Sequence, residues 1–443
     1  MEELAIFGGT PVRNRPYPAW PTADAHERAW LEKVLAGNRW FAGARGDDPE
    51  SLGALFGHRF AEFVGVRFGF PVTNGSVSLE VALRALGVGP GDEVIVPAYT
   101  FISTATSVLM VGAVPVFADI DPKNYCLDPI DCERKITART RAMIPVHLGG
   151  QMADMEALRA LAQHHGLSII EDSAQAIGAA WAGRRSGSWG DLSSFSFQSN
   201  KTITSGEGGL VATDDETLAE KVIAYRAFGR LKSAGQKTAG RSSELMSQHL
   251  SGNHRLSEWQ SAVLLGQLEK FPEQDAKRQK NAAFLTRRLA QVPGAEHVRC
   301  DALGSKHAYY YYLVRYDPVH FAGARPDLLA RALAAEGVPF LPSDNVPIYR
   351  HPVFEPDQLQ GTVLSPTLEH YRRAVDLRDP GCPAAETACR CTLILRHQVL
   401  LAEQVDMDDI VEALGKVQAH AGELERLQGG ANTHDRSAHA HVL

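Results

Sequence analysis

Short apolar runs alternate with longer helical patterns from about residue 50 to residue 230, and this alternation constrains the fold most. The runs are Glu93 to Val96, Val114 to Ala118, Ala142 to Val146, Leu167 to Ile170, Ser193 to Phe197 and Gly209 to Ala212. Continuous apolar runs of this length are typical of strands buried on both faces, with the intervening helices as the covering layers. The pattern predicts an α/β fold with a mostly parallel sheet, whose ligands gather at the carboxyl ends of the strands.

The second half of the chain has a different organisation. Residues 233–252 are polar and are read as a long loop, which is followed by a helix from Ser257 to Leu268 and another from Ala276 to Leu289. We place a domain boundary between these helices, at Phe271 and Pro272. The prediction is a large domain at residues 1–271 with an N-terminal arm to about residue 25, a smaller α+β domain at 272–427 and a disordered tail at 428–443.

Composition restricts the partners of the protein. The formal charge of -7 provides no basic field for nucleic acid or for an acidic membrane. No apolar run reaches the roughly 18 residues of a membrane helix, and the N-terminus lacks the pattern of a signal peptide. Cys389 and Cys391 could suggest a metal, but buried thiols are the simpler interpretation because no second pair completes a ligand set. We therefore expect a cytoplasmic protein without disulfides, a metal, nucleic acid or a membrane partner.

Lys201 is the first candidate for chemistry. A lysine in a loop usually lies on the surface, but Phe195, Phe197 and Ile203 would surround the stem of this one, and a glycine-rich turn follows it. Partly apolar surroundings favour the uncharged amine that a Schiff base requires. Lys201 is therefore a candidate covalent partner for a carbonyl-bearing cofactor.

Two further segments gain meaning beside Lys201. Asp172 follows a buried strand and could simply cap a helix, but at that place it could also hold the ring nitrogen of pyridoxal phosphate (PLP) protonated. Asn74, Gly75 and Ser76 precede the helical pattern from Val77 to Leu86, as an ordinary capped turn or as a phosphate site at the positive end of that helix. Taken together, the three elements could hold the two ends of one PLP ring and its phosphate.

Several segments in the same order resemble one family. TNGSVSLEVAL, GDEVIVPAYTFISTATSVLMVGAVPVFADID, IIEDSAQAIGA and FSFQSNKTITSGEGG are similar to the DegT/DnrJ/EryC1/StrS family of fold-type I PLP-dependent aminotransferases. The resemblance covers most of residues 5 to 425. It implies a PLP-binding domain with a mostly parallel sheet, followed by a smaller C-terminal domain.

The resemblance also implies roles for individual residues. Lys201 would carry the cofactor, Asp172 would be the partner of the pyridine nitrogen, and Gln175 would contact the ring or its phenolic oxygen. Phe101 would stack on the ring, and Gly75, Ser76 and Ser196 would contact the phosphate. Asn253 would reach the phosphate of the neighbouring subunit, which implies a homodimer with shared active sites.

The substrate is less well defined. PYPAWP, FSFQ and RCTLILRHQVLLA resemble the branch that makes aminocyclitols or 3-amino-5-hydroxybenzoate, and His397 matches a histidine of that branch, whereas Arg396 stands where another histidine is expected. The expected reaction passes an amino group from glutamine or glutamate to a keto-cyclitol or keto-sugar. Tyr309 to Tyr312 are read either as site residues or as strand packing. The alternatives are a dehydrating enzyme like 3-amino-5-hydroxybenzoate synthase and a regulatory protein without catalysis. The presence of Lys201 argues for transamination.

Overall fold

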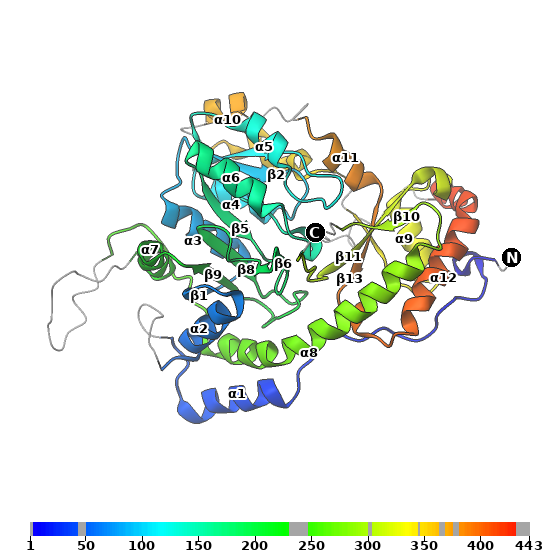
Figure 1. Cartoon of the computed structure of the whole chain (residues 1–443), viewed down its shortest axis with the longest axis horizontal. Coiled ribbons are helices and arrows are strands. Elements are labelled where there is room, and N and C mark those ends of the chain that lie inside the picture. The colour runs from blue at the N-terminus through cyan, green and yellow to red at the C-terminus, as the bar shows by residue number, and fades with distance from the viewer. Residues whose placement is uncertain are drawn as a thin grey trace.

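Two β-sheets lie one after the other along the molecule (Figure 1). The computed structural model describes residues 3–42, 50–229, 247–299, 304–343, 346–362, 368–374 and 381–430. The larger sheet has seven strands in the order β1-β9-β8-β5-β4-β2-β3, and a two-stranded ribbon, β6 (Ala180–Trp181) and β7 (Arg184–Arg185), lies beside it. The seven strands are β1 (Phe68–Val72), β2 (Glu93–Pro97), β3 (Val114–Ala118), β4 (Thr140–Met143), β5 (Ser168–Asp172), β8 (Leu192–Ser196) and β9 (Gly209–Thr213).

The large sheet is mostly parallel, as the apolar runs predict. Strands β2, β3, β4, β5 and β8 pair in parallel, whereas β9 pairs antiparallel with β8 and β1. Strand β1 was not among the strands expected from the sequence, and its FGFPV segment contains a proline. The proline is tolerated because β1 is an edge strand.

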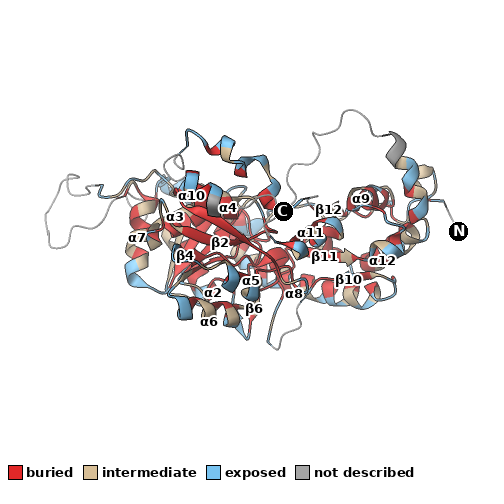
Figure 2. Ribbon diagram, turned by 90° about the horizontal axis from the view of Figure 1, so that it is seen from above, coloured by how far each residue is buried: buried red, intermediate tan, exposed pale blue. Residues whose placement is uncertain are grey.

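Helices cover both faces of the large sheet, and most of its residues are buried (Figure 2). They are α2 (Leu52–Val64), α3 (Gly75–Leu86), α4 (Ser103–Met110), α5 (Pro129–Lys135), α6 (Met155–His165) and α7 (Glu216–Arg226), with a 3-10 turn η2 (Leu148–Gly150). Helix α1 (Ala25–Gly37) packs farther out, against the helix that begins at Glu258. Alternate residues of β9 show the two faces. Val211 belongs to the core shared with α3 and α4, whereas Leu210 and Ala212 belong to a second core with Phe56 and Phe60 of α2.

A single long helix joins the two parts of the molecule, where the sequence predicts two helices with a boundary between them. Helix α8 (Glu258–Leu289) begins at a capping box of Ser257 and Gln260 and continues through Pro272 (Figure 1). Phe271 and Arg278 are both buried, so packing on either side of the proline keeps the segment helical. The expected helix ends at Leu268 and Ala276 are therefore wrong, and a domain boundary at Phe271 remains a prediction.

The smaller sheet is antiparallel, with the order β10-β11-β13-β12. Its strands are β10 (Ala295–His297), β11 (Tyr311–Tyr316), β12 (Leu341–Pro342) and β13 (Thr392–Arg396). The other elements of this half are α9 (Pro326–Ala335), α10 (Leu368–Ala374), α11 (Pro383–Arg390), α12 (Asp406–Ala419), η4 (Pro318–Phe321), η5 (Ile348–Arg350), η6 (Pro352–Phe354), η7 (Pro356–Leu359), η9 (Val399–Leu401) and η10 (Ala421–Gly430).

Two segments pack on a different half from the one expected. The N-terminal arm, with η1 (Ala5–Phe7), packs on the smaller half: Leu4 lies in its core, and the Arg13 guanidinium lies 2.7 Å from the Asp406 carboxylate. Conversely, η6 and α11 pack beside β3, where Phe354 contacts Phe117 and the Ala385 N–H donates to Asp119 at 2.9 Å. These long-range contacts have no signature in local sequence pattern.

Some expectations fall outside the described residues. The structure does not describe most of the predicted loop at 233–252 or residues 431–443 of the predicted tail. Residues 428–430 of that tail are described, and they form the end of η10. Within the described ranges, no helix is long and apolar enough to cross a membrane, and no group of three or more His, Cys, Asp or Glu side chains is arranged to hold a metal. The five described cysteines are free thiols.

Candidate active site

A cavity of about 630 Å3 opens at the carboxyl ends of the parallel strands. Eight of the residues singled out from the sequence line it: Asn74, Gly75, Ser76, Phe101, Asp172, Gln175, Ser196 and Lys201. Asp172 and Ser196 are the last residues of β5 and β8, and Phe101 and Asn74 follow β2 and β1. Segments far apart in the chain therefore meet at one edge of the sheet.

Asp172 is a buried carboxylate in this cavity, with 5% of its surface exposed. Its oxygens accept hydrogen bonds from the Thr104 hydroxyl at 2.9 Å and from the Ala174 N–H at 3.2 Å. Burial raises the pKa of the Asp172 carboxyl, although these two bonds and the charge of Lys201 act in the opposite direction. No helix begins directly after Asp172, because the next element of the chain is strand β6, so the capping alternative is wrong.

Asn74, Gly75 and Ser76 form the start of α3, and the helix points this end at the cavity. The Asn74 side chain accepts a hydrogen bond from the Val77 N–H at 2.9 Å, so this segment is indeed a capped turn. A Cβ atom at Gly75 would lie 2.7 Å from Cβ of Ser196, and the close approach of α3 to β8 therefore requires glycine. The free N–H groups of the first helical turn remain available to an anion.

Lys201 lies in the loop that follows β8. Its backbone N–H donates to the Gln198 carbonyl at 2.8 Å, and its backbone carbonyl accepts a hydrogen bond from the Trp20 indole N–H at 3.1 Å. The amine of Lys201 lies 4.2 Å from the centre of the Tyr310 ring. Lys201 is thus a half-buried lysine within the cavity and not a surface lysine.

Gln175 and Phe101 complete the expected set within one chain. The Gln175 side-chain oxygen accepts a hydrogen bond from the Gly149 N–H at 2.7 Å, which leaves the amide N–H groups for a ligand. Phe101 remains 38% exposed although it is a large apolar residue. An exposed aromatic ring at the wall of a cavity is available for stacking on a planar ligand.

The tyrosine run divides between the two expected roles. Tyr310 and Tyr311 line the cavity, with ring centres 4.1 Å apart. Tyr312 and Tyr309 pack with His297 in the smaller half, where the rings of His297 and Tyr312 stack at 4.0 Å. Site lining and strand packing are therefore both correct, for different members of the run.

Asn253 does not line the cavity of its own chain. It is exposed, and its side-chain oxygen accepts a hydrogen bond from Nε of Arg255 at 2.9 Å. Its expected contact with a cofactor phosphate therefore needs a second chain.

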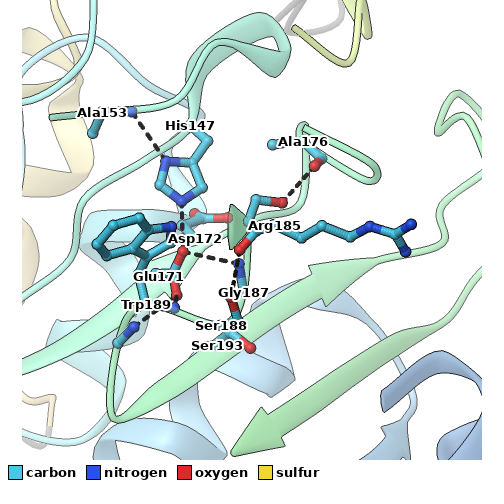
Figure 3. A network of polar contacts seen from close by, with 12 residues as sticks. His147, Ala153, Glu171, Asp172, Ala176, Arg185, Gly187, Ser188, Trp189 and Ser193 are labelled. Carbon is cyan, nitrogen blue, oxygen red and sulfur yellow. Dashed lines mark hydrogen bonds and ion pairs between the residues drawn. The ribbon is translucent and has the colours of Figure 1, made fainter. Parts of the chain in front are cut away.

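Sequence reasoning missed a buried network behind Asp172 (Figure 3). The Glu171 carboxylate has no exposed surface and accepts hydrogen bonds from three backbone N–H groups, those of Gly187, Trp189 and Gly190, at 2.6–2.8 Å. It also lies 2.9 Å from Nε2 of His147, whose Nδ1 accepts a bond from the Ala153 N–H at 3.3 Å. The signal available in the sequence was the acidic pair at the end of β5, because a carboxylate within a buried strand must find partners inside.

Comparison with known proteins identifies the fold and the family. A crystal structure of 3-amino-5-hydroxybenzoic acid synthase is similar with a TM-score of 0.78 and 30% identity, covering 92% of this chain and 100% of that chain. The fold is that of a PLP-dependent aminotransferase of fold type I.

The chain belongs to the DegT/DnrJ/EryC1/StrS aminotransferase family, which matches residues 21–388. L-glutamine:2-deoxy-scyllo-inosose aminotransferase of Streptomyces lividus is 40% identical, over 96% of this chain and 99% of that protein. A putative L-glutamine:3-amino-2,3-dideoxy-scyllo-inosose aminotransferase of Streptomyces kanamyceticus is 37% identical, over the same shares of the two chains. The expected family, fold type and cofactor are confirmed, and the alternative of a regulatory protein without catalysis has no support here.

Proposed function

We propose that this protein transfers the amino group of L-glutamine or L-glutamate to the carbonyl carbon of a keto-cyclitol. The observation that carries the proposal is one cavity lined by both Lys201 and the buried carboxylate of Asp172. The names of the two relatives support glutamine as donor and an inosose as acceptor.

Asp172 fits the ring nitrogen of PLP. No ion pair joins its buried carboxylate to a basic side chain among the residues that the structure describes, and a buried charge of this kind is costly without a partner. A protonated pyridine nitrogen would supply the missing positive charge. When bound, PLP supplies an electron sink for the negative charge that develops at the reacting carbon.

Lys201 fits the role of the residue that carries PLP, because it is the lysine among the described residues that line the cavity. Its amine attaches the cofactor and, once free, moves a proton from the amino-bearing carbon of the donor. In the second half of the reaction Lys201 returns a proton to the acceptor carbon. Phe101 would stack on the ring, and the Gln175 amide would donate to its substituents.

The phosphate would bind at the start of α3. Asn74, Gly75, Ser76 and Ser196 surround this end of the cavity, with backbone N–H groups and two hydroxyls as donors. We propose that Asn253 of a second chain adds a further donor, so that the active enzyme is a homodimer with shared sites. The exposure of Asn253 and its absence from its own cavity support this arrangement.

The charge of the cavity favours a neutral acceptor. Apart from Lys201 and Asp172, the ionisable groups among its described lining are Glu80, which is paired with Arg84, the exposed Glu207 and the two tyrosines. A nucleotide-linked keto-sugar would bring the two negative charges of a diphosphate to this lining, whereas a keto-cyclitol brings hydroxyl groups alone. Tyr310 and Tyr311 are suited to hydrogen-bond such hydroxyls.

An isotope-transfer assay tests the proposal. The PLP-loaded protein is incubated with 2-deoxy-scyllo-inosose and glutamine labelled with 15N at the α-amino group, and the products are examined by mass spectrometry. We expect the amino product to carry the label, and glutamine labelled at the side-chain amide to give unlabelled product. Absence of amination of the cyclitol, together with amination of a nucleotide-linked keto-sugar, would contradict the proposed acceptor.

The likeness to 3-amino-5-hydroxybenzoic acid synthase keeps a dehydrating reaction as the second candidate. An amino-dehydroshikimate added to the same protein distinguishes the two. Loss of water from that compound, without cyclitol amination, would favour the second candidate.

A further inference from the structure

Two aromatic side chains from distant parts of the chain donate hydrogen bonds to the backbone of the Lys201 loop. The Trp20 indole N–H lies 3.1 Å from the carbonyl oxygen of Lys201, and Nε2 of His397 lies 2.9 Å from that of Asn200. Trp20 stands 181 residues before Lys201, and His397 stands 197 residues after Asn200. The N-terminal segment and the end of β13 therefore meet at the lysine that the reaction uses.

The two rings also contact each other. Their centres lie 4.6 Å apart with an angle of 87° between the planes, an edge-to-face arrangement that aromatic pairs favour. His397 is fully buried and Trp20 is half-buried. The backbone N–H of His397 donates to the Tyr310 carbonyl at 3.1 Å. His397 therefore also connects the Lys201 loop to Tyr310, whose ring lies beside the Lys201 amine.

His397 acts as a neutral donor in this arrangement. A carbonyl oxygen only accepts hydrogen bonds, so Nε2 of His397 carries the proton. Burial, together with the positive charges of Arg278, Arg396 and Lys201, lowers the pKa of His397 well below its usual range, although the bond to Asn200 acts in the opposite direction. The bond to Asn200 therefore persists at neutral pH without a second proton on the ring.

The other described bonds at residues 198–204 are local, and a further long-range bond, from the Gln260 side chain to the Glu207 carbonyl at 2.9 Å, lies at the far end of the loop. The Lys201 N–H bonds to the Gln198 carbonyl, the Asn200 N–H bonds to the Gln198 side chain at 2.9 Å, and the Thr204 hydroxyl bonds to the Phe197 carbonyl at 3.0 Å. Such bonds shape the loop but do not tie it to the rest of the cavity. The bonds from Trp20 and His397 do so, because each comes from a different part of the fold.

We propose that Trp20 and His397 are positioning residues, which hold the backbone at Asn200 and Lys201 and thereby set where the Lys201 amine lies in the cavity. The proposal rests on the proposed function in one respect, that Lys201 is the lysine that carries PLP. A shift of about 1 Å at a reacting group can lower a rate roughly a hundredfold, so this backbone support affects turnover without contact with either substrate.

Four variants of the PLP-loaded protein test the proposal. Trp20→Phe and His397→Phe each remove one donor and keep an aromatic ring, whereas His397→Gln keeps an N–H donor at a similar reach. Trp30→Phe is the matched control, because Trp30 is another half-buried indole of the N-terminal region, whose N–H lies 3.2 Å from Glu269. For each variant we measure the pH titration of the visible cofactor absorbance, kcat and KM for glutamine, and the melting temperature.

The expected results separate positioning from packing. Trp20→Phe and His397→Phe should each move the midpoint of the absorbance titration by about half a pH unit and lower kcat about tenfold, with KM changed less than about threefold. His397→Gln should recover most of both effects, and Trp30→Phe should match the wild type. If His397→Phe fails to fold, Trp20→Phe and His397→Gln still give the comparison.

Three outcomes would overturn the proposal. These are a wild-type titration and kcat in Trp20→Phe, equal impairment in His397→Gln and His397→Phe, and a wild-type protein that develops no visible absorbance with PLP. The last outcome would also remove Lys201 from the proposed function. A wild-type protein with the absorbance and with a half-reaction on glutamine, but without amination of a cyclitol, would contradict the proposed acceptor alone, and the titrations would still decide the role of Trp20 and His397.

Discussion

Asp172 shows at the scale of one residue how strongly a site can require a ligand. Its carboxylate is buried at the end of β5 and held by Thr104 and Ala174, without a described basic side chain paired to it. The fold therefore buries an ionisable carboxyl group where no described basic side chain forms an ion pair with it. A cofactor with a basic ring nitrogen resolves this conflict.

The pKa of Asp172 leads to a prediction for the cofactor-free protein. Its folded pKa is raised by burial, so its contribution to stability is fully present below the unfolded pKa of about 3.9 and is lost as pH rises through the folded pKa. The free energy of unfolding should therefore fall, relative to that of Asp172→Asn, as pH rises from about 4 to about 7. Chemical denaturation at several pH values measures this difference. A constant difference between the two proteins across that range would contradict the prediction.

The same substitution should impair the reaction. Asp172→Asn keeps the size of the side chain and an acceptor for Thr104, but it cannot balance a protonated ring nitrogen. We expect turnover to fall by orders of magnitude in protein that still binds PLP. Steady-state kinetics checks this, and Thr104→Val should lose far less because the carboxylate remains. A PLP-loaded Asp172→Asn protein with near wild-type turnover would remove Asp172 from its role.

Lys201 carries the simplest prediction at this scale. Lys201→Ala should abolish transamination and leave the melting temperature of the cofactor-free protein almost unchanged, because the loss of one half-buried side chain removes the chemistry and little packing. Activity assays and thermal unfolding of the same preparation check both parts. Substantial turnover without added amines would exclude Lys201.

At the scale of elements, the site depends on how closely helix α3 approaches strand β8. Gly75→Ala would place a Cβ 2.7 Å from that of Ser196 and push the start of the helix away, at a cost of about 1–3 kcal/mol. We expect weaker PLP binding, measured as a higher dissociation constant by absorbance titration. Gly89→Ala is the control, since a Cβ there meets no atom within 4 Å. Equal PLP affinity in both variants would show that the close approach has no part in cofactor binding.

Helix α8 shows why local signals fail at this scale. Pro272 predicts an end of the helix, but the contacts of α8 with α1, α2 and α12 on both sides of the proline keep it continuous. Helical stability in proteins comes mainly from such tertiary packing, and it outweighs the missing hydrogen bond of one proline.

At the scale of the whole molecule, the prediction concerns the dimer. Asn253→Asp would bring a negative charge to the phosphate of a partner's site, so this variant and Lys201→Ala should both be nearly inactive as homodimers. Mixed under conditions that exchange subunits, they should regain activity, because one of the two sites in each mixed dimer combines Lys201 with an intact Asn253. Enzyme assays of the mixture measure the recovery.

The matched control puts both substitutions in one chain and mixes it with the wild type. In that mixed dimer each site has one defect, so activity should fall below that expected from dilution. No recovery in the first mixture despite verified subunit exchange, or a fully active monomer, would show that the sites are not shared. The role of Lys201 would be unaffected.

The sequence by itself determined the parallel strands of the large sheet, the family, and the candidate residues that line the cavity. Apolar runs marked the parallel strands, because strands buried on both faces carry no polar alternation. Asp172, Lys201 and the turn at Gly75 were visible because strand ends and the positive end of a helix place chemistry at predictable points.

Only the tertiary structure decided what depends on distant contacts. The continuity of α8 across Pro272, the Glu171–His147 network and the approach of Trp20 and His397 to the Lys201 loop all depend on contacts between separate elements. Local periodicity and turn chemistry in the sequence do not predict which distant residues come into contact. Buried polar groups must find partners, but the fold chooses which ones, because the partner is set by the packing of whole elements.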